Sequence, residues 1–187
     1  ILDLLHDTDT LEYFKSLNLR PDQYKVLLDS KGRLTMVFAT DDGEVQVWKE
    51  KKPNTSDFTI SRYKVKWSNA ANKVDAVQAS YDDKDRLTIT AIPDNGLSHE
   101  LLLLQETQPG IFVQKSLDGH EEHVIFANVS HDAQGAPIIV SGDEQKTIKV
   151  WKDDGAQAAE AQRKAQRELI EQQVKQTKHI SDGFTQV

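Results

Sequence analysis

Apolar and polar residues alternate along much of the chain, in short segments separated by turn residues. In 33–39 every second residue is apolar, which is the period of a half-buried strand. Asp42-Gly43 then gives a hairpin signal before a second alternating segment, 44–49. The pattern predicts antiparallel strands joined by tight turns.

The same order of segments recurs along the chain. Residues 33–35 (Arg-Leu-Thr) return as 86–88, an offset of 53, and a match between later segments has an offset of 50. Residues 47–50 (Val-Trp-Lys-Glu) return as Val-Trp-Lys-Asp at 150–153, an offset of 103 that equals the sum of the other two. Three matches in one register predict a repeat. The predicted copies are 24–67, 74–117 and 123–152.

The third copy is one strand short. Its fourth strand is expected near residue 162, where the sequence Ala-Glu-Ala-Gln-Arg-Lys is typical of a helix. Units of about 50 residues with four strands predict β-propeller blades, and a propeller closes with about four to eight of them. The sequence leaves open a piece of a longer chain, a ring completed by other chains, or a sandwich or open barrel.

Residues 119–152 carry a family resemblance. Their motifs resemble one WD40 repeat: Gly119-His120, then Ser141-Gly142-Asp143, then 147–152 with Trp151. Residues 24–52 resemble the repeat in part. The first copy's Asp-x-x-Gly-Arg-Leu and Asp-Gly turns also resemble the blades of propeller lectins. The resemblance implies a β-propeller that binds proteins or carbohydrates. Lys49 and Lys152 depart from it, because the WD40 family has Asp there.

Helices are expected on both flanks. Asp9 and Glu12 have the spacing of a capping box, and Pro21 ends that helix. The segment 156–179 contains neither Pro nor Gly and predicts a long helix. Ile1–Leu5, or the equivalent segment of a second chain, is expected to pair with the open edge of the third unit. The alternative is that its leucines extend the N-terminal helix or pack as a loop. The predicted parts are 1–22 with a short helix, the β-repeat domain 23–155, the helix 156–179 and a tail 180–187.

Composition narrows the functional classes. The 187 residues carry 23 Lys and Arg against 30 Asp and Glu, a net charge of −7, which argues against a general nucleic-acid binder. The chain has no Cys, which excludes disulfides, thiolate metal sites and cysteine nucleophiles. No run is long and apolar enough to predict a membrane span. Nothing in the sequence indicates a compartment.

The sequence contains none of the nucleotide-binding or hydrolase motifs that carry a defined chemistry. His120 and His123 flank two glutamates, but at a junction of loop and strand, where their side chains do not converge as they would on a helix. A hydrogen bond of His120 within its unit is the expectation there. Residues 82–85 lack the Gly and the final Glu of a calcium loop. We therefore expect no metal, no cofactor and no catalysis.

The predicted function is a non-catalytic interaction or scaffold module that binds other proteins through the C-terminal helix and the loops of the β repeats. Other chains could also complete its ring. Carbohydrate recognition through aromatic clefts is the alternative, and a small hydrolase the second alternative. The candidate binding residues are three tryptophans and three apolar residues of the C-terminal helix. They are Trp48, Trp67, Trp151, Leu169, Ile170 and Val174.

Overall fold

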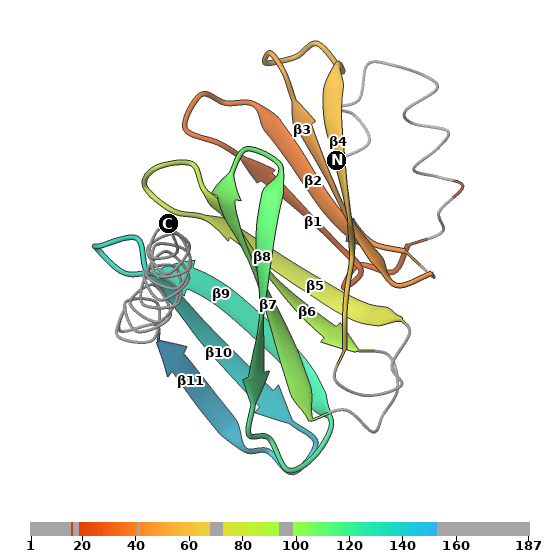
Figure 1. Ribbon diagram of the computed structural model, residues 1–187, viewed down its shortest axis with the longest axis vertical. Coiled ribbons are helices and arrows are strands. Elements are labelled where there is room, and N and C mark those ends of the chain that lie inside the picture. The colour runs from red at the N-terminus through yellow and green to blue at the C-terminus, as the bar shows by residue number, and fades with distance from the viewer. Residues whose placement is uncertain (1–15, 17–18, 41, 68–72, 94–98, 153–187) are drawn as a thin grey trace, which may run out of the picture. The chain divides into compact units, whose positions relative to one another are not determined.

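The computed structural model describes residues 16, 19–40, 42–67, 73–93 and 99–152. The chain divides into two units, Ile1–Lys152 and Asp153–Val187, and every described strand belongs to the first. Its described residues form three antiparallel sheets, so the all-β prediction is confirmed (Figure 1). Both expected flanking helices, and the expected pairing of Ile1–Leu5, lie outside the described residues apart from Ser16, Leu19 and Arg20.

Each of the first two sheets is a four-stranded meander in which sequential strands are neighbours. The first sheet contains β1 (Tyr24–Leu28), β2 (Leu34–Ala39), β3 (Glu44–Glu50) and β4 (Phe58–Lys64). The second contains β5 (Val74–Tyr81), β6 (Leu87–Pro93), β7 (Glu100–Gln108) and β8 (Ile111–Asp118).

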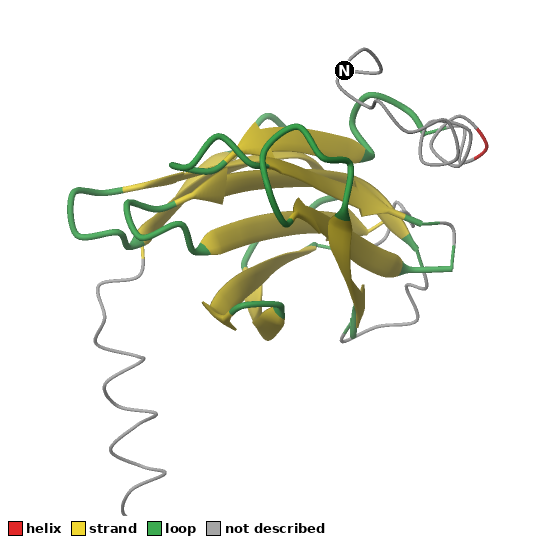
Figure 2. Cartoon of the chain, turned by 90° about the horizontal axis from the view of Figure 1, so that it is seen from above, coloured by secondary structure: helices red, strands yellow, loops and turns green. Residues whose placement is uncertain are grey.

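The third sheet has three strands among the described residues, as the repeat predicts. They are β9 (Val124–His131), β10 (Pro137–Asp143) and β11 (Ile148–Lys152). Figure 2 shows that strands and the loops between them make up nearly all of the described chain. No helix among the described residues is long and apolar enough to cross a membrane.

The pairing register confirms the repeat. Trp48 of β3 lies opposite Met36, and Trp151 of β11 lies opposite Ile139. Met36 and Ile139 each follow the first turn of their unit at the same distance, so the two tryptophans are equivalent.

The turn after the first strand is built in the same way in all three units. An aspartate, Asp29 in the first unit, accepts the N–H groups of the residues two and four positions later, Lys31 and Arg33, both at 2.9 Å. Asp82 and Asp132 do the same in the other two units. The residue three positions after the aspartate has a positive φ in each turn. These residues are Gly32 (73°), Asp85 (57°) and Gly135 (79°).

Apolar side chains on facing sheets form the core. The face of β2 and β3 that carries Val37 and Val47 packs against β5, β6 and β7 of the second sheet. The opposite face of the second sheet, with Leu101 and Leu103, packs against β9 and β10. Burial of these side chains is the main stabilising term, at about 1.5 to 3 kcal/mol for each large one.

Candidate functional site

A cleft of about 740 Å³ opens between the first and second sheets, at the end where the turns after β1 and β5 meet the loop between β7 and β8. Its walls come from equivalent segments of the two units. Six basic and three acidic residues line it. They are Lys31, Arg33, Lys49, Lys51, Lys84 and Arg86, with Glu50, Asp85 and Glu106.

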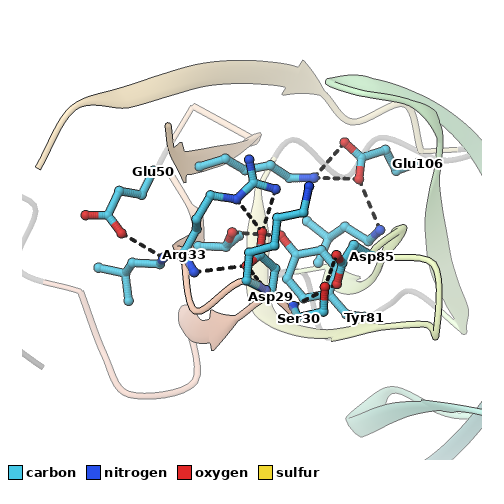
Figure 3. Close-up of polar contacts among 12 residues, drawn as sticks. Asp29, Ser30, Arg33, Glu50, Tyr81, Asp85 and Glu106 are labelled. Carbon is cyan, nitrogen blue, oxygen red and sulfur yellow. Dashed lines mark hydrogen bonds and ion pairs between the residues drawn. The ribbon is translucent and has the colours of Figure 1, made fainter. Parts of the chain in front are cut away.

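Glu50 and Glu106 are buried carboxylates at the ends of the third strands of their sheets. Glu50 accepts the backbone N–H of Leu34, the first residue of β2, at 3.0 Å, and a loop N–H at 2.8 Å (Figure 3). Glu106 accepts the N–H of Leu87, the first residue of β6, at 3.1 Å, and that of Gly110 at 2.8 Å. Each carboxylate therefore joins the start of one strand to the loop after another.

The turn aspartates are also satisfied within the protein. Asp29 forms an ion pair with Arg33, with Oδ2 2.6 Å from Nη2, and Asp82 pairs with Arg86 at the same distance. Burial would raise the pKa of each carboxyl, but the N–H groups of the turn and the arginine together lower it below its usual value. Both aspartates remain charged at neutral pH and hold their turns in place.

The two turns contact each other across the boundary between the sheets. Asp85, in the positive-φ position of the second turn, accepts the N–H of Ser30 in the first turn at 2.8 Å (Figure 3). Lys49 of the first sheet donates to Glu106 of the second at 2.7 Å. The floor of the cleft is thus cross-linked by polar bonds that connect residues more than 50 positions apart.

The cleft presents positive charge outward. Of its acidic groups, Glu50 and Glu106 are buried and Asp85 is bonded to Ser30, whereas Lys31 and Lys84 are exposed at equivalent positions of their turns. Arg86 has a half-exposed side chain although it is paired with Asp82. In a chain with a net charge of −7, this cleft concentrates cations in one place. An arrangement of this kind can bind carboxylate, phosphate or sulfate groups by charge-assisted hydrogen bonds.

A second polar network lies within the third unit. His120 Nδ1 is 2.9 Å from Asp143 Oδ2, and His120 Nε2 is 2.8 Å from Ser141 Oγ. Trp151 Nε1 donates to the same Ser141 Oγ at 2.8 Å. Each of these hydrogen bonds has a donor and an acceptor when His120 carries its proton on Nδ1: His120 donates to Asp143, Ser141 donates to His120 and Trp151 donates to Ser141. The expected hydrogen bond of His120 within its unit is confirmed, and the network positions the side chain of Trp151.

The three described members of the predicted binding set, Trp48, Trp67 and Trp151, belong to different core clusters, and none of them lines the cleft. Trp48 is 7% exposed and packs against Phe38 and Phe58, with ring centroids 5.8 and 6.0 Å apart. Trp67 and Trp151 are half-buried beside core clusters. Packing accounts for the described positions of these rings, and their binding role stays a prediction. Leu169, Ile170 and Val174 lie outside the described residues.

Four residues of the cleft were not among the candidates that the sequence indicates: Lys31, Lys84, Glu50 and Glu106. The lysines occupy the third position of the repeated Asp-x-Lys-x-Arg turn, so the repeat itself was the available signal. Glu50 is the last residue of β3 and Glu106 lies near the end of β7, and no local sequence pattern distinguishes either glutamate.

Comparisons with known proteins give no family for the chain. No family model matches it, and no curated protein matches it. Among solved structures it is similar to a fucose lectin from Kordia zhangzhouensis in complex with methyl-fucoside. The TM-score is 0.40 at 13% identity, over 71% of this chain and 93% of that one.

A second similar structure is BBS1N in complex with ARL6DN. The TM-score is 0.32 at 10% identity, over 72% of this chain and 53% of that one. Likeness at these scores does not extend to function. The WD40 resemblance rests on the residues alone, since no family model supports it.

Proposed function

We propose that this protein is a non-catalytic recognition module, and that its cationic cleft binds an acidic segment of a partner protein. The observation that carries the proposal is the equivalent placement of Lys31 and Lys84. Both are exposed at the mouth of the cleft, while the carboxylates around them are bonded to backbone N–H groups and arginines.

An extended acidic segment suits this cleft because the cations come from two separate turns. Lys31 and Lys84 stand at the two sides of the boundary between the sheets, so a ligand with several carboxylates can reach both. Each exposed ion pair contributes only about 0.2 to 1 kcal/mol, and salt screens it over about 8 to 10 Å. The proposed binding is therefore additive over several carboxylates and weakens as salt is added.

The test is fluorescence anisotropy with a labelled oligoglutamate peptide, and an oligoglutamine peptide of equal length as the uncharged control. Lys31→Glu/Lys84→Glu should weaken binding of the acidic peptide by about tenfold or more, which corresponds to about 1.4 kcal/mol. Lys66→Glu/Lys73→Glu is the matched control, since it makes the same charge change at exposed positions outside the cleft. Equal loss of binding in both double variants would reject the cleft as the site.

The carbohydrate alternative makes a different prediction. Sugar binding through stacked aromatic rings would persist at high salt and would be unchanged in Lys31→Glu/Lys84→Glu. It would be lost in Trp151→Ala, because the half-buried indole ring of Trp151 is then absent. A glycan array with the wild-type chain and Trp151→Ala separates it from the acidic-peptide proposal. Residues 156–179 are a second proposed contact for protein partners, and pull-down with and without 156–187 tests that contact.

A further inference from the structure

The third sheet presents an apolar face that no described residue covers. This third-sheet face is formed by alternate residues of its strands. In β11, exposed and part-buried residues alternate, as expected for a strand with one side open to solvent. Its members are Phe126, Ile138, Val140, Ile148 and Val150.

The positions of Ile148 and Val150 are buried in the other two sheets. Val45 and Val47 of the first sheet, 0% and 2% exposed, pack against the second sheet, and their equivalents in β7 pack against the third. Ile148 and Val150 occupy these positions in β11 and are 65% and 58% exposed. The sequence therefore retains the apolar residues of an interface where the described structure provides no partner.

Phe126 adds to the apolar area of this face. It lies opposite Gly142 in the pairing of β9 with β10, and a side chain at Gly142 would overlap its ring. The ring therefore lies over the bare backbone of Gly142, where the first two sheets carry Ala39 and Ile92. It remains 43% exposed.

A second difference between the third-sheet face and the faces buried inside the chain concerns a hydrogen bond. Thr35 and Thr88 hydrogen-bond to residues of the next sheet, Tyr81 and His131. The equivalent residue of the third sheet is Ile138, which offers no hydrogen bond. The polar contact that anchors the next unit is missing, so this face suits an apolar partner surface better than a further unit of the same repeat.

We propose that the third-sheet face is a dimer interface, on which the same face of a second copy packs in a symmetric contact. The corresponding outer face of the first sheet, with Met36 and Trp48, is already buried. The free apolar sheet face that a second copy offers, within the part of the chain that the structure describes, is therefore the third-sheet face itself. A twofold contact pairs a patch with its own copy, and apolar sheets pack face to face about 10 Å apart.

Sedimentation velocity of the full chain over a range of micromolar concentrations tests the proposal. The wild-type chain should pass from monomer to dimer, and Ile148→Lys/Val150→Lys should weaken dimerisation by about tenfold or more. Ile111→Lys/Val113→Lys is the matched control, because both residues are 54% exposed in β8 and lie outside the third-sheet face. It should dimerise like the wild type.

A cross-linking arm keeps the proposal testable if the lysine variants fold poorly. The chain has no Cys, so Val150→Cys introduces a single reactive thiol near the proposed twofold axis. A short bifunctional thiol reagent should give covalent dimers of Val150→Cys and few of Val113→Cys. A wild-type chain that stays monomeric, or equal cross-linking of both variants, would overturn the proposal and leave the cleft proposal untouched.

Discussion

The hydroxyl oxygens of Tyr81 and Thr35 lie 2.7 Å apart, across the boundary between the first and second sheets. His131 makes the equivalent contact one boundary further on, with Nε2 3.0 Å from Thr88 Oγ1. Tyr81 and His131 each end the first strand of a unit, and the threonines each follow the first residue of a second strand. The equivalent polar bond thus joins each pair of successive sheets beside their apolar core.

Thr35→Val should destabilise the fold by about 1 to 3 kcal/mol, because it leaves the Tyr81 hydroxyl without its partner. Burial raises the pKa of Tyr81 to about 12, so this hydroxyl keeps its proton and its need for a partner at any ordinary pH. Urea unfolding gives the free energy of unfolding. Thr59→Val makes the same change at an exposed position of β4 and should cost much less. Equal losses in the two variants would contradict the role of the bond.

His131 should make the stability of the fold depend on pH. Burial lowers the pKa of His131, and the nearby Asp82 only partly opposes that effect. Since the pKa is lower in the folded than in the unfolded chain, this contribution to stability is complete above the unfolded pKa of about 6.5. It falls as the pH drops from there toward the folded pKa.

The variant that isolates this effect is His131→Tyr, which introduces the residue found at the equivalent position of the second sheet, Tyr81. We expect the free energy of unfolding to change less between about pH 7 and about pH 5 in the variant than in the wild type. Urea titrations across this pH range measure the slope. An unchanged slope would show that His131 does not titrate differently in the folded and unfolded chains.

Ser141→Ala should destabilise the third unit by about 1 to 3 kcal/mol, because Trp151 and His120 both lose a buried hydrogen-bond partner. Tryptophan fluorescence should also change, since Trp151 loses the bond that positions its indole. Ser130→Ala is the control, because Ser130 is exposed on the neighbouring strand β9. A Ser141→Ala chain as stable as Ser130→Ala would mean that the network adds nothing to the fold.

The strands and the repeat could be predicted because their signals are local. The alternation of apolar and polar residues predicts β2. The repeat offset of 103 residues predicts that Trp48 and Trp151 lie in equivalent strands, as they do. The cleft depends instead on contacts between residues far apart in sequence. The bond from Lys49 to Glu106 spans 57 positions, and no local pattern shows that two turns with lysines face one another.

Which faces of the sheets are covered also could not be predicted from local sequence. Val47 and Val150 lie in nearly identical segments, and alternation predicts an inward position for each. Only the packing of the sheets separates them, since Val47 is 2% and Val150 58% exposed. Whether an apolar strand face is covered depends on the neighbouring sheet, and the strand's own sequence does not contain that information.

Chemical-shift mapping can show whether acidic ligands bind in the cleft between the first two sheets. Amide signals of the ¹⁵N-labelled full chain are followed while unlabelled oligoglutamate is added at low salt. We expect the largest shifts in 30–33, 84–86 and 107–110, and their loss in Lys31→Glu/Lys84→Glu. Shifts centred on the third sheet, or shifts that survive in that double variant, would contradict it.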